Sequence, residues 1–162
     1  MIVALKVVLM VCLGGISYQD FKERKVFWFL FPLAMLLFGL LLFLHTNGSK
    51  TFIYYSVTNT LLVTAMVAIL FVYTRFVLKK AFLNHSLGLG DILFFYALGV
   101  GFPTITFVVL FVGSIVFSLL VFLMSKKKLA LSTVPLAGLM AFFLAFVILS
   151  SMVSKSPSLY AY

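Results

Sequence analysis

Long uninterrupted runs of apolar residues alternate along the chain with short clusters of polar and basic residues. A helix needs roughly 20 apolar residues to cross the hydrocarbon core of a bilayer. Six segments come near that length: 2–19, 26–45, 52–74, 91–102, 104–124 and 132–153. Because the runs are continuous rather than alternating in polarity, they predict membrane helices rather than a barrel. The fourth segment is short before Pro103, so it is either tilted or begins earlier, around Gly88 to Gly90.

Basic residues predict how these six helices are oriented. Nine of the 12 Lys and Arg residues lie in the first, third and fifth loops: Lys22, Arg24, Lys25, Arg75, Lys79, Lys80, Lys126, Lys127 and Lys128. The opposite side carries Lys6, Lys50 and Lys155. Cytoplasmic loops of membrane proteins are enriched in Lys and Arg. The three basic loops are therefore expected in the cytoplasm, with both termini outside.

Composition excludes most other classes of protein. Of the 162 residues, 65% are hydrophobic and 9% are charged, whereas a soluble domain carries roughly a quarter charged residues. The single cysteine, Cys12, excludes a disulfide framework and a Cys-rich zinc site. His45 and His85 fall on opposite faces, so neither a metal nor another cofactor is expected. We therefore expect one all-α integral-membrane domain over residues 1–162.

The net charge of +9 is attributed to membrane topology and to attraction for anionic lipids, not to nucleic-acid binding. Segment 75–86 contributes to this charge and has two interpretations. It fits an amphipathic helix lying on the bilayer surface, and it equally fits a solvated connector that follows the charge rule.

The chain has only three acidic residues, Asp20, Glu23 and Asp91. Asp20 is expected at the inner end of the first helix and Asp91 at the start of the fourth, at the same membrane face and at similar depth. Ionisable groups at membrane depth are costly and usually face a bundle interior or a wet cavity. Glu23 is interpreted as a solvated loop residue.

Two carboxyls brought together share a proton, because both cannot ionise cheaply at close range. An aspartic hydrolase uses that state: the ionised acid takes a proton from water while its protonated partner donates to the carbonyl oxygen. Gly88 and Gly90 would allow positive φ and close approach of an extended substrate beside Asp91. The structural alternatives are that Asp20 caps the next helix or offsets the charge of the basic loop, and that Asp91 interacts with the dipole of the fourth helix.

These motifs resemble the type IV prepilin peptidases, including the archaeal preflagellin peptidases. The resemblance rests on the first-helix Asp20 followed by a basic loop, on Gly88-Leu89-Gly90-Asp91, and on the Pro-containing stretch Ser132–Gly138. It implies a six-span aspartic protease of the cytoplasmic membrane, with Asp20 and Asp91 catalytic and Gly88 and Gly90 at the substrate. It also implies that the substrates are pilin-like precursors with short basic leaders, cut just before an apolar helix.

The chain departs from that family pattern at two places. Val26-Phe27-Trp28 stands where the family often has Ile-Pro-Asn, and Leu93 where it often has Lys. The long members carry a Cys-containing methyltransferase domain, so this chain resembles a short member with peptidase activity alone. The alternatives are another Gly-x-Gly-Asp protease similar to presenilin or signal peptide peptidase, a small transporter, or a non-enzymatic pilus-assembly protein.

Overall fold

Every regular element among the described residues is helical. The computed structural model describes residues 1–23, 26–46, 48–77, 88–129, 135–153 and 159–160. Its helices are α1 (Ile2–Glu23), α2 (Leu30–His45), α3 (Ser49–Val72), α4 (Leu89–Gly99), α5 (Thr104–Leu129) and α6 (Leu136–Val153). A π-helical turn, η1 (Tyr73–Val77), continues α3. The all-α prediction is confirmed for this part of the chain, and each α-helix overlaps one predicted segment.

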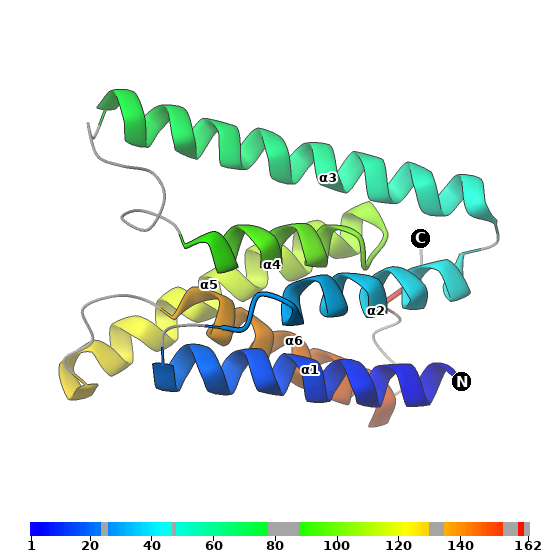
Figure 1. Cartoon of the computed structure of the whole chain (residues 1–162), viewed down its shortest axis with the longest axis horizontal. Coiled ribbons are helices and arrows are strands. Elements are labelled where there is room, and N and C mark those ends of the chain that lie inside the picture. Colours follow the sequence, from blue (N-terminus) through cyan, green and yellow to red (C-terminus); the bar gives the residue numbers. More distant parts are fainter. Residues whose placement is uncertain (24–25, 47, 78–87, 130–134, 154–158, 161–162) are drawn as a thin grey trace.

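Successive helices run in opposite directions along one common axis (Figure 1). One end of the bundle therefore collects the last turns of α1, α3 and α5 together with the first turns of α2, α4 and α6. We call this the site end. The turns between α2 and α3 and between α4 and α5 lie at the opposite end, as does the first residue of the chain (Figure 1).

Four of the helices are long and apolar enough to cross a membrane: Ile2–Glu23, Ser49–Phe76, Thr104–Met124 and Leu136–Val153. The other two are shorter, with 16 residues in α2 and 11 in α4. At 1.5 Å per residue α4 is only about 16 Å long, roughly half the thickness of a hydrocarbon core. The chain is therefore a helical membrane protein with four candidate spans and two shorter apolar helices.

Prolines mark where two of the helices begin. Pro103 and Pro135 directly precede α5 and α6, and their carbonyl oxygens accept the N–H groups of Phe107 and Leu139 at 2.8 and 3.0 Å. Proline suits this position because the first N–H groups of a helix have no intrahelical partner. Of the two alternatives for the fourth segment, the earlier start is confirmed, because α4 begins at Leu89.

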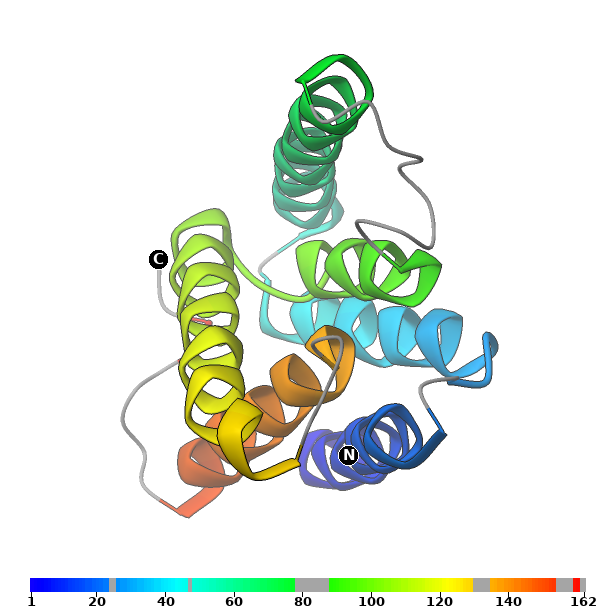
Figure 2. The ribbon, with the colours of Figure 1, turned by 90° about the vertical axis from the view of Figure 1, so that its left-hand side faces the viewer.

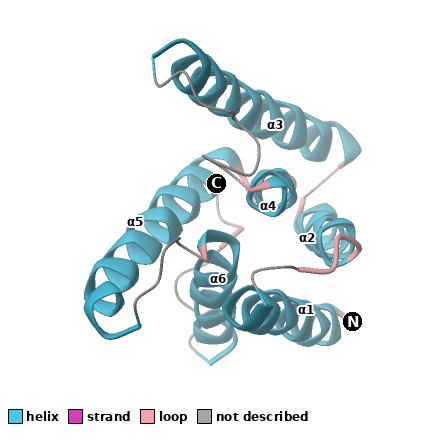
Figure 3. Ribbon diagram, turned by 60° about the vertical axis from the view of Figure 1, so that its left-hand side comes forward, coloured by secondary structure: helices cyan, strands magenta, loops and turns pink. Residues whose placement is uncertain are grey.

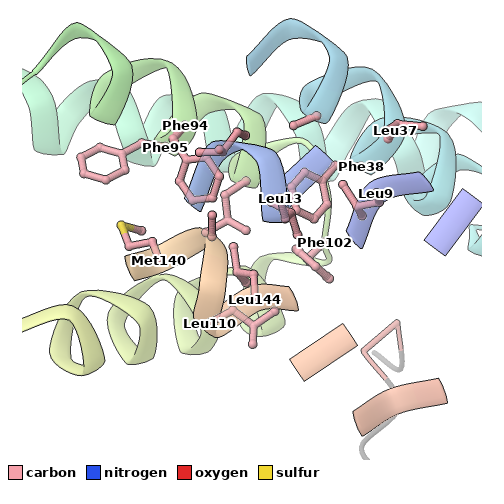
Figure 4. Close-up of a cluster of buried hydrophobic side chains, with 14 of the residues drawn as sticks. Leu9, Leu13, Leu37, Phe38, Phe94, Phe95, Phe102, Leu110, Met140 and Leu144 are labelled. Carbon is pink, nitrogen blue, oxygen red and sulfur yellow. The ribbon is translucent and has the colours of Figure 1, made fainter. Parts of the chain in front are cut away.

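The core is built from α1, α2, α4, α5 and α6, whose apolar side chains meet along the bundle axis (Figure 4). It includes Leu9, Leu13, Phe38, Phe94, Phe95, Phe102, Leu110, Met140 and Leu144. The most extensive helix pair is α1 with α6, and α2 packs on both α1 and α4. In contrast, α3 stands apart from the other helices (Figures 2 and 3), and Asn59 and Val63 are its buried residues. This packing fixes the ends of α1, α4 and α6 relative to one another.

Candidate functional site

Asp20 and Asp91 both lie at the site end of the bundle. Asp20 is in the last turn of α1, and Asp91 is in the first turn of α4. Both side chains are half-buried. The structure thus places the two acids, 71 positions apart in the sequence, beside the same third element, the first turn of α6.

The contact is made through consecutive backbone amides of α6. The Gly138 N–H donates to Asp20 Oδ2 at 2.7 Å, and the Ala137 N–H donates to Asp91 Oδ1 at 2.9 Å. The Gly88 N–H also donates to Asp91 Oδ2, at 3.1 Å. The first N–H groups of a helix are unsatisfied and lie at the positive end of its dipole, so they suit carboxylate charge. The two carboxyls are therefore held at neighbouring amides of one helix turn.

The structural roles expected for single acids are met in part. Asp91 does lie in the first turn of α4, and its bond to the Gly88 N–H caps that helix. The Asp20 carboxyl accepts from α6, and the Phe27 N–H just before α2 donates to Gln19 Oε1 at 3.0 Å. Each acid therefore stabilises a helix start, and both stabilise the same one.

The glycines beside Asp91 differ from expectation. Gly88 has φ −71° and ψ 147°, and Gly90 lies within α4, so the positive-φ prediction is wrong for both; the positive-φ glycine of the described chain is Gly48. Close approach does matter at Gly90, where a Cβ would lie 3.0 Å from Phe31 Cζ. Gly90 thus lets the Phe31 ring pack against the start of α4. A substrate-binding role for Gly88 and Gly90 stays a prediction.

The remaining candidates lie away from the two acids or outside the described residues. Glu23 is exposed at the end of α1. His45, at the opposite end of the bundle, stacks on Tyr160 with ring centroids 4.0 Å apart. His85 lies outside the described residues, as does segment 75–86 beyond Val77. No group of three His, Cys, Asp or Glu side chains that could hold a metal is found where the structure describes the chain.

Sequence reasoning did not assign Ala137 and Gly138 to the site. The sequence feature closest to them is the Pro-containing stretch Ser132–Gly138, which is part of the resemblance to the prepilin peptidases. A backbone amide donor has no side-chain signature, so spacing alone could not identify these two residues as the partners of the acids. Trp28 and Leu93, at the two departures from the family pattern, both have exposed side chains.

Searches against protein-family models, curated proteins and solved structures find no match to this chain. A functional interpretation therefore depends on the geometry of the two carboxyls and on the motifs around them.

Proposed function

We propose that this chain is a membrane aspartic endopeptidase in which Asp20 and Asp91 act as one catalytic pair. The observation that carries the proposal is that both carboxyls bind adjacent amides of α6, Gly138 and Ala137. Two of the chain's three acids are thus gathered at one point of an apolar bundle. The first turn of a helix has up to four N–H groups without an intrahelical partner, so the two hydrogen bonds alone are also those of capping. What favours a catalytic pair is that carboxyls from two different helices fill adjacent positions in a chain that has only three acids.

The chemistry follows from a proton shared between the two carboxyls. The ionised member removes a proton from water as the water oxygen attacks a peptide carbonyl carbon. The protonated member donates to the carbonyl oxygen, and the resulting tetrahedral species collapses with proton transfer to the leaving amine. The Ala137 and Gly138 amides hold the two carboxyls while charge moves between them. No metal or cofactor takes part in this scheme.

The substrate class follows from the position of the site and from the resemblance to prepilin peptidases. We infer that the substrates are pilin-like or preflagellin-like precursors of the cytoplasmic membrane, cut between a short basic leader and an apolar helix. In this proposal the chain has six membrane-inserted helices, with α2 and α4 as short members. The site end then faces the cytoplasm, where the leader is accessible.

The main competing function is non-enzymatic, because the same hydrogen bonds are those of two helix caps. A cleavage assay separates the two functions. The purified chain in lipid nanodiscs is mixed with a synthetic precursor that has a basic leader, a Gly and an apolar helix, and products are identified by mass spectrometry. We expect the parent to cut at the leader boundary and Asp20→Asn and Asp91→Asn each to lose at least about 1000-fold in rate, the scale of removing one member of a catalytic unit.

Asparagine keeps one acceptor oxygen, which can still accept from the Gly138 N–H in Asp20→Asn, so that variant should retain the parent's stability within about 1 kcal/mol. Asp91 accepts from both Gly88 and Ala137, so Asp91→Asn loses one of these acceptors and should cost about 1–3 kcal/mol while remaining folded. Cleavage by either variant at the parent's rate would contradict the proposal. An inactive parent across leaders of varied basic sequence would favour the capping role in an assembly protein or transporter.

A further inference from the structure

Gly138, at the start of α6, packs directly against Asp20 of α1. A Cβ built on Gly138 would lie 2.9 Å from both Asp20 Cβ and Asp20 Oδ2, and 3.3 Å from Asp20 Cγ. Carbon contacts under 3.0 Å are not tolerated, so any other residue at position 138 would force a neighbour to move. Gly138 is also the residue whose N–H binds Asp20 Oδ2 at 2.7 Å.

The neighbouring structure does not offer an easy way to relieve such a clash. Asp20 Cβ is attached directly to the backbone of α1, so it cannot rotate away as the end of a long side chain would. The α1–α6 pair is the most extensive helix contact of the bundle. At the other end of the two helices, Lys6 Nζ donates a hydrogen bond to Ser151 Oγ at 3.3 Å. The Asp20 carboxyl can rotate to relieve the contact with Oδ2, whereas the contact with Cβ is relieved only when the start of α6 moves away from α1.

We infer that Gly138 is a positioning residue for the catalytic pair: its missing side chain is what lets Asp20 reach the α6 amide beside the one that holds Asp91. The effect of Gly138 on cleavage rests on the proposed function, whereas its effect on the position of Asp20 does not. Ala137 and Gly138 are covalently adjacent in one helical turn, so they fix the two carboxyls in one relative arrangement. Replacing Gly138 separates the pair while leaving both acids in the chain.

The variant that tests this is Gly138→Ala, measured in the precursor-cleavage assay beside Gly14→Ala and Gly101→Ala. Gly14 lies in α1, and a Cβ added there would meet no atom within 4 Å, so the substitution creates no clash. A Cβ on Gly101 would clash with Phe38 at 2.8 Å, at the end of the bundle away from the site. The first control therefore reports the effect of a helical Gly→Ala change, and the second reports the effect of a clash elsewhere.

We expect Gly138→Ala to lower kcat by about 100-fold, the effect of a misplacement near 1 Å, with KM changed by less than about threefold because substrate contacts remain. Its pH–rate profile should also shift relative to the parent, since the two carboxyls no longer couple in the same way. Gly14→Ala and Gly101→Ala should keep the parent's pH profile. An unchanged kcat and profile in folded Gly138→Ala would overturn the inference while leaving the proposed function standing.

A second measurement does not depend on activity or on that variant folding. In the parent labelled with ¹⁵N-glycine, the Gly138 amide proton should shift with pH as Asp20 titrates, because its hydrogen-bond acceptor changes charge. In Asp20→Asn that pH-dependent shift should disappear. A Gly138 amide that does not titrate in the parent, or that titrates equally in Asp20→Asn, would overturn the inference. A parent that titrates as expected and cleaves no precursor would contradict the proposed function alone.

Discussion

At the scale of single residues, the central feature is a pair of carboxyl groups bound to the first turn of one helix, α6. Asp20 and Asp91 come from different helices, and each accepts a backbone N–H from the first turn of α6. Neither residue is unusual alone, because an acid near a helix N-terminus is a common stabilising feature. Their placement on adjacent amides is what makes a shared proton, and therefore acid–base chemistry, the central hypothesis.

A shared proton predicts a bell-shaped dependence of kcat/KM on pH. At low pH both carboxyls are protonated and no base is left to activate water, so the rate falls. At high pH both are ionised and no acid is left to protonate the carbonyl oxygen, so the rate falls again. The two apparent pKa values belong to the pair rather than to either residue. A rate of precursor cleavage that stays flat from acid to neutral pH would contradict this arrangement.

At the scale of elements, α3 packs on α4, and one fully buried amide, that of Asn59, lies in this contact. Asn59 Nδ2 donates to the carbonyl oxygen of Gly99, the last residue of α4, and to that of Phe102 in the turn before α5, both at 2.8 Å. The Asn59 side chain is fully buried. Since an unsatisfied polar group in an apolar interior is costly, these two bonds are expected to anchor the turn.

The variant Asn59→Leu keeps the size of the side chain and leaves both carbonyls without their donor. We expect it to lower the free energy of unfolding by about 1–3 kcal/mol, measured by denaturant titration in mixed micelles. Thr64→Val is the matched control on α3, since Thr64 Oγ1 lies 3.0 Å from Tyr96 OH at an exposed position. Its cost should stay below about 1 kcal/mol. Equal losses for the two variants would show that Asn59 has no special anchoring role.

Much of this arrangement follows from the sequence because it depends on composition and spacing. Apolar runs predicted the helices, and Pro103 and Pro135 mark the starts of α5 and α6. Asp20 lies at the end of the first helix and Asp91 at the start of the fourth. Because successive membrane helices run in opposite directions, these two positions are expected at the same face. By contrast, the backbone partners of the acids and the ordinary φ of Gly88 depend on how α1, α4 and α6 pack. These details depend on contacts between residues far apart in the sequence, so the pattern of residues within one segment does not predict them.

At the scale of the whole molecule, the distribution of charge and the alternation of helices agree on one site end. The basic residues predicted in the first, third and fifth loops lie partly in helices that extend further than expected: Lys22 in α1, Arg75 in η1, and Lys126, Lys127 and Lys128 in α5. The ends of these helices all lie at the site end (Figure 1). Lys22 in the last turn of α1 and Arg75 in η1 lie at this end, and both side chains are exposed. The account therefore predicts that the site end faces the cytoplasm, where a precursor's basic leader is found before processing.

This orientation is tested by labelling cells with a membrane-impermeant maleimide. Lys50→Cys, near the start of α3, should react in intact cells, whereas Lys22→Cys should react only after the membrane is permeabilised. Both positions are exposed. Native Cys12 is buried, so the parent serves as an unlabelled control. The reverse labelling pattern would place the site end outside and would contradict the proposed substrate access.

The central claim is that Asp20 and Asp91 act as one unit, and the most direct test is the precursor-cleavage rate of both single Asn variants and of the double variant. Members of one catalytic unit show strongly non-additive losses. We predict that Asp20→Asn, Asp91→Asn and the double variant all fall to the same residual rate, measured on protein that a thermal unfolding transition shows to be folded. Losses that multiply in the double variant, or cleavage retained by either single variant, would contradict the account.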